Sequence, residues 1–399
     1  MKIINLIENL DNTYGGPAKS VPYMCKYLND IDIDTEILSV KYNKNEINSL
    51  VDEYKLVWKS FKYDFIKKIR HSLGLKKYLN DTLKNEKNII LHTHNLWNYI
   101  PYVAFKMGEK YNVPLILAIR GSLYKWSLLQ GKLQKTIAWK LFQEKALRNA
   151  SCIHVTEINE LKAVRDLGIK IPIAIVPNGI NFEEFKNIKN KIDSKKSFGL
   201  DVDKKYILFM SRLHPKKGLE YLTDAWISLA NKYKEWDLLI VGPVYDEKYI
   251  VDIKKRIKKA NLENRVTFTG MITGEKRVDS FGASDLFVLP SHTENFGIAI
   301  AEAMATKLPV ITTHGTPWKE IEEKGAGWWV ELSQNNISVA IEEALSCSDE
   351  ELKQKGLNGY ELIKKYEWKY QASKMKKLYE YILNGGYKPK FVYDVGDEI

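Results

Sequence analysis

The stretch that decides the fold reads Asp285-Leu-Phe-Val-Leu-Pro290 and, after a short turn, Glu294-Asn-Phe-Gly-Ile-Ala-Ile-Ala-Glu302. The apolar run that Pro290 ends predicts a short buried strand. Small and helix-favouring side chains from about Phe296 to Ala305 predict a helix directly after it. The turn Ser291–Asn295 then lies at a helix N-terminus, where unpaired backbone N–H groups and the helix dipole favour an anion.

Two glutamates accompany this predicted anion site. Glu294 lies in the turn and Glu302 in the helix, and both would repel a phosphate unless they face other groups. An ionised carboxylate only accepts hydrogen bonds, so sugar hydroxyls are its natural partners. Backbone amides for a phosphate and two carboxylates for hydroxyls indicate a nucleotide-sugar site. The alternative for an isolated pair at this spacing is a helix cap and a solvated helix face.

Length and composition indicate the class of protein. The chain has 399 residues, enough for two domains with separate cores, and a net charge of +11. Such an excess attracts phosphorylated substrates, anionic lipid or nucleic acid without choosing among them. No apolar run approaches the ~18 residues that span a bilayer, and the N-terminus predicts a strand rather than a signal peptide. Cys25, Cys152 and Cys347 are scattered, which favours a reducing cytoplasm and disfavours structural zinc.

Apolar strands and helical stretches alternate in both halves of the chain, which predicts parallel sheets with helices on both faces. Lysine-rich residues 186–205 resemble a linker, and the end of the chain from Asn384 is expected to be mobile. The strands are expected at Met1–Ile7, Asp34–Val40, Asn88–His94, Pro114–Ser122, Ser151–Thr156, Ile173–Val176, Tyr206–Ser211, Asp237–Val241, Val266–Thr269, Asp285–Leu289 and Pro309–Thr313.

Several polar and aromatic residues follow the strands of the first half. The turn Gly15-Gly16 follows the first strand, where backbone can approach a ligand closely. His92 and His94 lie on one side of the third strand; a core position is expected for His92 and a ligand-facing one for His94. Arg120 ends the fourth strand, where it can fork onto a phosphate or form an ordinary ion pair. Trp139, in the helical stretch that follows, is expected in the core.

The segment Lys55–Lys77 carries eight basic residues and one acidic residue. Its aromatic and aliphatic residues Trp58, Phe61, Phe65, Ile69 and Leu73 recur every three to four positions. That spacing predicts an amphipathic helix with one cationic face, which suits an anionic membrane surface. The alternative is a helix on the surface of the domain with a solvated face.

Arg212 and Lys217 lie in a strand-to-helix turn of the second half. A diphosphate leaving group gains negative charge as the glycosidic bond breaks, and two fixed cations can stabilise it. A divalent metal is the alternative, typically held by an Asp-x-Asp sequence. Asp32-Ile-Asp34 and Asp201-Val-Asp203 have that pattern, but their positions predict surface turns.

These motifs together closely resemble the retaining GT-B glycosyltransferases of the large bacterial family 4, over the whole chain and in the same order. The resemblance implies two Rossmann-like, doubly wound α/β domains facing across a cleft. It implies an acceptor-binding domain at residues 1–185, a nucleotide-sugar domain at 200–365, a helix at 366–384 that crosses back to the first domain, and a tail at 385–399. The motifs that carry it are Gly15-Gly16, Pro177-Asn-Gly-Ile180, Ser211-Arg-Leu213 with Lys217-Gly218, Glu294-Asn-Phe-Gly297 with Glu302-Ala-Met304, and Leu308-Pro-Val310.

The resemblance also implies roles for individual residues. The donor, with a UDP-sugar favoured, would contact Arg212 and Lys217 through its diphosphate, Glu302 through its ribose and Glu294 through its sugar. The reaction would need neither a metal nor another cofactor. Further donor contacts would come from Gly15, Gly16, Met271, Ile272, Asn295, Phe296, Gly297 and Ile298, and acceptor contacts from His94, Asn95, Trp97, Ser122 and Trp126.

One departure from the family pattern concerns the reacting centre. Many members carry a histidine at the position of Arg120, whereas Ile119-Arg-Gly-Ser122 is similar to a Pro-Arg-Gly variant. Either His94 or Arg120 is therefore expected nearest the reacting centre, and both are catalytic candidates with Glu294, Arg212 and Lys217.

The sequence thus favours a cytoplasmic hexosyl- or N-acetylhexosaminyltransferase that acts on a glycan or a lipid-linked acceptor in surface polysaccharide synthesis. It is expected to lie peripherally on the inner face of the cell membrane. A sugar-nucleotide epimerase or hydrolase on the same scaffold is the first alternative. A nucleic-acid-binding protein is disfavoured, because no RNA-binding signature accompanies the basic residues.

Overall fold

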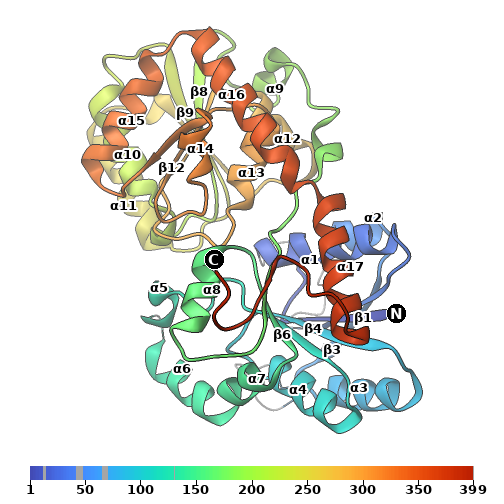
Figure 1. Ribbon diagram of the computed structural model, residues 1–399. Coiled ribbons are helices and arrows are strands. Elements are labelled where there is room, and N and C mark those ends of the chain that lie inside the picture. Colours follow the sequence, from blue (N-terminus) through green and yellow to red (C-terminus); the bar gives the residue numbers. More distant parts are fainter. Residues whose placement is uncertain (12–14, 42–47, 65–70, 130, 399) are drawn as a thin grey trace. The chain divides into compact units, whose positions relative to one another are not determined.

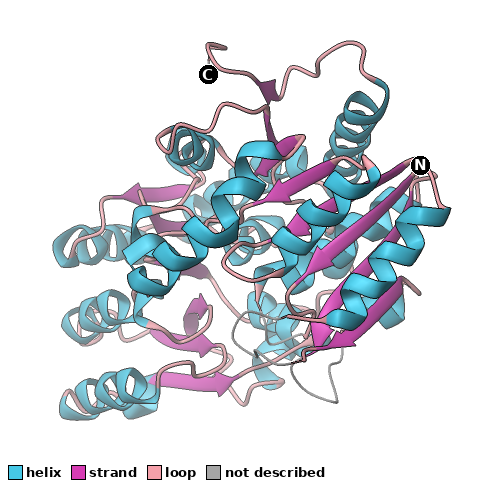
Figure 2. Ribbon diagram, turned by 90° about the horizontal axis from the view of Figure 1, so that it is seen from below, coloured by secondary structure: helices cyan, strands magenta, loops and turns pink. Residues whose placement is uncertain are grey.

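Two parallel β-sheets form the frame of the chain. In the computed structural model, the described residues are 1–398 without 12–14, 42–47, 65–70 and 130. They divide into one unit of Met1–Gly179 with Trp368–Ile399 and a second unit of Ile180–Glu367. Figure 2 shows strands with helices packed around them, as expected for doubly wound α/β domains.

The first unit has an eight-stranded sheet in the order β14-β7-β6-β5-β4-β1-β2-β3. All neighbouring strands are parallel except β14, which runs antiparallel to β7. The strands are β1 (Lys2–Ile7), β2 (Asp34–Lys41), β3 (Val57–Lys62), β4 (Ile89–His94), β5 (Leu115–Ala118), β6 (Cys152–Val155), β7 (Ile173–Ile175) and β14 (Val392–Tyr393). The helices are α1 (Gly16–Asn29), α2 (Ser49–Glu53), α3 (Leu73–Asn85), α4 (Ile100–Tyr111), α5 (Lys125–Leu129), α6 (Lys132–Ala138), the π-helical turn η3 (Trp139–Gln143), α7 (Glu144–Asn149), α8 (Ile158–Arg165) and α17 (Trp368–Asn384).

The second unit has a six-stranded parallel sheet in the order β10-β9-β8-β11-β12-β13. The strands are β8 (Lys205–Met210), β9 (Trp236–Val241), β10 (Val266–Gly270), β11 (Leu286–Leu289), β12 (Val310–Thr313) and β13 (Gly327–Val330). The α-helices are α9 (Lys191–Lys196), α10 (Leu219–Leu229), α11 (Glu247–Lys259), α12 (Gly274–Gly282), α13 (Ile298–Ala305), α14 (Glu320–Glu323), α15 (Gln334–Ser346) and α16 (Asp349–Ile363), and the 3-10 turns are η4 (Phe182–Phe185), η5 (Pro215–Lys217), η6 (Glu263–Arg265) and η7 (Lys364–Tyr366).

Each sheet reverses its strand order at one point. In the first unit the chain builds β1 to β3 on one side, and β4 then pairs with the other side of β1. In the second unit β11 likewise pairs with β8 after β9 and β10 have been laid down. Open α/β sheets bind ligands at such reversals, outside the carboxyl ends of the strands. The turns that follow β8 and β11 contain Arg212, Lys217 and Glu294.

The helix predicted within Lys55–Lys77 is wrong over Val57–Lys62, which forms the edge strand β3. Lys59 on this strand lies 3.1 Å from the buried carboxylate of Glu36, and Tyr78 donates to the same carboxylate at 2.6 Å. The β-branched and aromatic residues of this stretch favour a pleated edge over a helix with the same apolar spacing. Residues 65–70, which include Phe65 and Ile69, lie outside the described residues.

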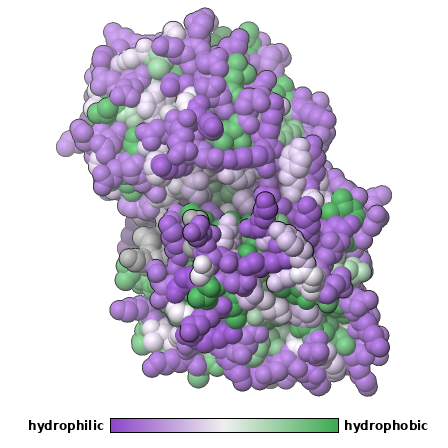
Figure 3. All heavy atoms as spheres, in the orientation of Figure 1, coloured by the Kyte–Doolittle hydropathy of each residue, from purple (hydrophilic) through white to green (hydrophobic). Residues whose placement is uncertain are grey.

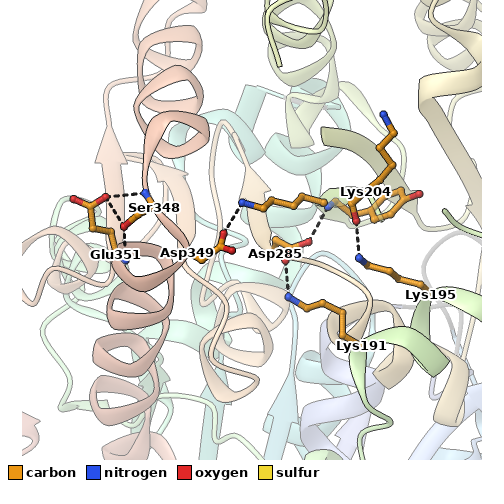
Figure 4. A network of polar contacts seen from close by, with 9 residues as sticks. Lys191, Lys195, Lys204, Asp285, Ser348, Asp349 and Glu351 are labelled. Carbon is orange, nitrogen blue, oxygen red and sulfur yellow. Dashed lines mark hydrogen bonds and ion pairs between the residues drawn. The ribbon is translucent and has the colours of Figure 1, made fainter. Parts of the chain in front are cut away.

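The prediction of a linker at residues 186–205 is also wrong, because this segment is bound to the second sheet. Helix α9 lies within it, and Lys191 reaches Asp285 at 2.5 Å, just before β11 (Figure 4). Asp285 in turn accepts from the backbone of Tyr206 at 2.9 Å, and Lys195 donates to carbonyls of the same segment. The chain instead changes unit at Gly179. Lys191 and Lys195, which the sequence suggested were solvated, bind a carboxylate and backbone carbonyls at the amino ends of the strands.

The C-terminal segment belongs to the first unit. Helix α17 packs beside α1 and buries Trp368, Met375 and Leu378 (Figure 1). The expected mobility of the tail is not what the structure shows at Val392–Tyr393, which pairs with β7. Arg165 secures this strand by donating to the carbonyl of Tyr393 at 3.0 Å.

We expect Leu378→Ala to destabilise the first unit by about 2–5 kcal/mol, because the side chain is fully buried between α17 and the sheet. Urea unfolding followed by hydrogen exchange of the β6 and β7 amides measures this. The control Tyr370→Ala, on the same helix but 50% exposed, should change the free energy of unfolding by less than about 1 kcal/mol. Equal effects of the two substitutions would contradict the packing of α17 on this unit.

Candidate active site

An ion pair joins the two turns at the reversal point of the second sheet. The ammonium group of Lys217, after β8, contacts the carboxylate of Glu294, after β11. Both side chains are nearly buried, with exposures of 12% and 11%. Charges this far from water remain there only when paired and hydrogen-bonded. The pair therefore fixes the relative position of one cation and one carboxylate within the second unit.

Backbone contacts hold the same two turns together. The amide of His292 donates to the carbonyl of Lys216 at 2.9 Å and so joins the two turns. The amide of Glu294 donates to the carbonyl of Gly315, in the turn after β12, at 2.8 Å. Gly218 adopts φ +68°, and a Cβ there would lie 2.0 Å from the carbonyl oxygen of Pro290. Only glycine fits at this crossing of the β8 and β11 turns. The Gly218 of the sequence motif is thus explained by close packing of backbone.

Glu294 is held in its ionised form. Burial raises the pKa of this carboxyl, but Lys217, Lys216 and Ser291 outweigh that effect and bring the pKa below its ordinary value. An ionised carboxylate can accept hydrogen bonds from sugar hydroxyls.

Arg212 lies on the same turn as Lys217 but has a different environment. Its guanidinium stacks over the ring of Tyr245, with 5.3 Å between the guanidinium carbon and the ring centroid. In the described part of the chain no carboxylate forms an ion pair with it. Arg212 thus provides a cation at the carboxyl end of β8 that a phosphate can bind.

Helix α13 begins four residues after Glu294. Gly297 caps the helix with φ +77°, and the described residues provide no acceptor for the amides of Gly297 and Ile298. These amides and the helix dipole suit an anion. Phe296 is buried against Trp318 and Tyr366, and its carbonyl accepts from the Trp318 indole. Phe296 can therefore offer a ligand its amide, whereas its ring belongs to the core.

Glu302 is buried in the second turn of α13, where Arg277 donates to it at 2.6 Å. The same arginine contacts Glu184, so one guanidinium bridges two carboxylates. A carboxylate has about four acceptor positions, so Glu302 can accept further hydrogen bonds while it is paired with Arg277. Arg277 was not found from the sequence, because an arginine inside a helix has no distinctive local pattern.

Met271 and Ile272 follow β10 at the same sheet edge. Met271 is 40% exposed, and Ile272 is partly buried against the core. The carboxylates of both Asp-x-Asp sequences, by contrast, are exposed at the opposite edge of their sheets: Asp32 and Asp34 flank the buried Ile33 at the start of β2, and Asp201 and Asp203 lie in the turn before β8. The surface turn expected from the sequence is confirmed for Asp201–Asp203, whereas Asp34 already belongs to β2.

In the first unit, Arg120 is the centre of a polar network after β5. Its guanidinium donates to Asn178 at 2.5 Å and to Nδ1 of His94 at 3.2 Å. Its Nε is buried and has no partner among the described residues. The residue adopts φ +51°, a conformation that is costly for a side chain of this size. Burial lowers the pKa of Arg120 to about 10, so it stays charged at neutral pH.

His94 does not have the ligand-facing position that the sequence led us to expect. It is buried like His92, and both of its ring nitrogens are bound: Nδ1 to Arg120 and Nε2 to the Asn5 oxygen at 3.1 Å. Burial lowers the pKa of both histidines well below the ordinary value. The side chain of His94 is neutral and acts through Arg120, which leaves Arg120 as the candidate closer to a ligand.

The carbonyl of Val176 determines which ring nitrogens of His154 and His92 carry a proton. Nε2 of His154 faces the carbonyl of Val176 at 2.8 Å, so it must carry the proton. Nδ1 of His154 then accepts from Nε2 of His92 at 3.2 Å, and Nδ1 of His92 accepts from the Tyr379 hydroxyl at 2.9 Å. This chain of hydrogen bonds ties β4 and β6 to α17.

The loop after β4 supplies the other acceptor candidates. Asn95 and Trp97 both have positive φ, 76° and 69°, and the indole of Trp97 donates to the carbonyl of Ser122 at 3.1 Å. Gly15 has φ +107° and precedes Gly16, the first residue of α1. Strained backbone gathers at functional sites, and here it marks the carboxyl edge of β1, β4 and β5. The side chain of Trp126 lies outside the described residues.

Glu160 is a site residue that sequence reasoning missed. It is fully buried under the Arg120 turn and accepts from the amides of Gly121 and Thr156. Burial raises the pKa of this carboxyl to about 7, against these hydrogen bonds. No local pattern separates it from the exposed glutamates of other helices.

The comparisons with known proteins agree with this geometry. Residues 190–361 match the family described as glycosyl transferases group 1, and residues 14–184 match Glycosyltransferase Family 4. The chain belongs to these glycosyltransferases. The expected fold is confirmed, since it superposes on the crystal structure of HepE from Anabaena in complex with UDP and glucose with a TM-score of 0.78 at 17% identity, covering 95% of this chain and 99% of HepE.

Curated relatives differ in their named reactions. The lipopolysaccharide core biosynthesis mannosyltransferase LpsB of Rhizobium meliloti is 31% identical over 40% of this chain and 45% of that protein. An Escherichia coli protein named UDP-Gal:alpha-D-GlcNAc-diphosphoundecaprenol alpha-1,3-galactosyltransferase is 25% identical over 84% of this chain and 79% of its own length. The matches to the first three curated relatives span 45%, 54% and 36% of those proteins.

We expect Arg120→Met to lower the free energy of unfolding by about 1–3 kcal/mol, because it leaves Asn178 and His94 without their donor. Arg120→Lys should lower the free energy of unfolding by less, since an ammonium group can replace one of the two hydrogen bonds. Urea unfolding measures both. Arg256→Met, which removes exposed ion pairs with Asp224 and Asp252, is the control and should cost under about 1 kcal/mol. An Arg120→Met variant no less stable than this control would contradict the network.

Proposed function

We propose that the chain is a retaining, metal-independent glycosyltransferase that moves a sugar from a nucleoside diphosphate sugar to a glycan or lipid-linked acceptor. The observation that carries the proposal is the set of groups around the Lys217–Glu294 pair in the second unit. Two cations, two amides of a helix N-terminus and an ionised carboxylate match a diphosphate joined to a sugar. A UDP-sugar donor is favoured by HepE, crystallised with UDP and glucose, and by the galactosyltransferase named for UDP-Gal.

Each residue would have the following role in binding. Arg212 and the α13 amides hold the diphosphate, and Lys217 both binds it and orients Glu294. Glu294 accepts from donor sugar hydroxyls, Glu302 accepts from the ribose, and the segment at Met271 and Ile272 meets the base. In the first unit, Arg120 and the loop with Asn95 and Trp97 bind the acceptor. Gly15 and Gly16 leave room for phosphate at the end of β1.

The reaction would break the bond between the anomeric carbon and the β-phosphate oxygen. The acceptor oxygen attacks the same face of the sugar, and its proton passes to the leaving phosphate oxygen. Negative charge grows on that phosphate in the transition state, so cations fixed in advance lower the barrier. Arg212 and Lys217 supply the compensating positive charge without a metal.

The acceptor and the location are proposed on wider grounds. LpsB and the galactosyltransferase are named for lipopolysaccharide core and a diphosphoundecaprenol acceptor, which supports a role in surface polysaccharide synthesis. Among the described residues, no helix has the length and apolarity to cross a bilayer. The three cysteines are unpaired, as in proteins of a reducing compartment. From the lipid-linked acceptor in the galactosyltransferase's name, we propose a cytoplasmic location, peripherally on the inner membrane face.

We expect Arg212→Ala to reduce turnover with a UDP-sugar about a hundredfold, because one cation at the leaving phosphate is lost. Lys217→Met alone would strand the buried Glu294 carboxylate, so the double substitution Lys217→Met with Glu294→Gln is the better test of the pair. Lys258→Ala, exposed on α11, is the matched control and should retain full turnover.

Four outcomes would contradict the proposal, the last of them an inverted product. The first is wild-type turnover in Arg212→Ala, and the second is loss of activity in excess chelator. The third is rapid hydrolysis or epimerisation of the donor without an acceptor, which would favour the alternative enzyme class. NMR of the product's anomeric proton tests retention, since an inverted configuration would exclude the proposed mechanism.

A further inference from the structure

Four aliphatic side chains of the first unit project into solvent in one short region. Leu129, Leu133, Ile137 and Leu141 are 51–75% exposed and follow one another at intervals of four residues. On helices, this spacing places Leu133, Ile137 and Leu141 along one side. Figure 3 shows apolar spheres among hydrophilic ones over the part of this unit where Figure 1 places α5 and α6. A row of exposed leucine and isoleucine on a single protein surface marks an interaction site.

The helix that carries this row is not held by the core. None of the seven residues of α6, all of them described, is buried. The helix continues through the π-helical turn η3 into α7, where Ala146 and Leu147 are buried. A helix with an apolar side and no buried residue needs another surface to cover it.

Basic residues surround the apolar row. Residues 125–148 contain six lysines or arginines and one acidic residue. Lys132, Lys140 and Lys145 are exposed on α6, η3 and α7. Lysines beside aliphatic residues favour the boundary between the anionic headgroups and the acyl chains of a bilayer. There the methylene groups of each lysine lie on apolar groups, and its ammonium group meets lipid phosphates. In a two-fold contact with a second copy, these lysines would face one another and repel.

The row lies next to the proposed acceptor edge. Helix α5 begins five residues after Arg120, directly beyond the β5 turn. Trp139 packs near Trp97 at 6.4 Å between ring centroids, and the Lys135 ammonium lies 5.4 Å from the Trp97 ring. Lys135 also donates to the carbonyl of Ser127, which joins α6 to α5. The exposed row is therefore connected to the loop that carries Asn95 and Trp97.

We propose that the surface of Lys132–Lys145 is an interfacial docking surface for an anionic lipid bilayer. Leu133, Ile137 and Leu141 enter the headgroup boundary, and Lys132, Lys140 and Lys145 bind lipid phosphates. This deepens the proposed function, on which it rests for the lipid-linked acceptor, because docking brings the Trp97 loop to the membrane surface. It also moves membrane contact away from Lys55–Lys77, where Lys59 is occupied by Glu36.

Sedimentation with lipid vesicles tests the surface without donor or acceptor. The full-length protein is mixed with vesicles of phosphatidylcholine alone or with phosphatidylglycerol. We expect binding to the anionic vesicles only, and a loss of about tenfold or more in partition coefficient for the triple variant Leu133→Ser, Ile137→Ser, Leu141→Ser. The lysine variant Lys132→Gln, Lys140→Gln, Lys145→Gln should lose binding in proportion to the phosphatidylglycerol content.

The double variant Val251→Ser, Val339→Ser is the matched control, because it removes exposed aliphatic residues from α11 and α15 of the second unit. It should bind vesicles like the wild type. Unchanged melting temperature and UDP binding in all variants establish that they are folded. Equal vesicle binding by the triple variant and the wild type would overturn the docking surface, as would a wild-type dimer that the triple variant converts to a monomer. Vesicle binding without any sugar transfer would refute the proposed function alone.

Discussion

The Lys217–Glu294 ion pair is the interaction on which the proposed donor site depends. It is nearly buried, and it spans the two strands, β8 and β11, at which the sheet reverses its order. Parallel strands bring their carboxyl ends to one edge, so residues 77 positions apart in sequence become neighbours there. The close crossing at Gly218 and Pro290 shows that the backbones of these two turns pack directly against each other. The pair sets the distance between the cations for a diphosphate and the carboxylate for a sugar.

Much of the fold could be predicted from the sequence, because buried parallel strands are short apolar runs and their turns follow directly. The edge strand β3 was missed, since its aromatic residues also fit a helical spacing. Residues 186–205 were mistaken for a linker, because no sequence pattern shows that Lys191 binds the distant Asp285 or that Lys195 binds backbone carbonyls. Trp139 was expected in the core, and it is only partly buried on a helix whose neighbour α6 has no buried residue.

For the site, the sequence identified the groups with a chemical reason to lie at strand ends, including Arg212, Lys217 and Glu294. It could not identify Arg277, Glu160 or the histidine–tyrosine chain, because these act through partners brought near by the fold. His94 shows the difference most clearly. Its place at the end of β4 suggested contact with a ligand, yet Arg120 and Asn5 occupy both of its nitrogens. The histidine then serves to hold the arginine in a strained conformation at the edge of the sheet.

The central claim is that fixed cations and helix amides at the reversal point of the second sheet bind the diphosphate of the donor. Calorimetric titration of the wild type and Arg212→Ala with UDP, UMP and uridine tests it most directly. The account predicts that UDP binds the wild type at least about tenfold more tightly than uridine, and that Arg212→Ala removes most of that difference. Equal affinities for UDP and uridine, or a preference for UDP that survives in Arg212→Ala, would contradict it.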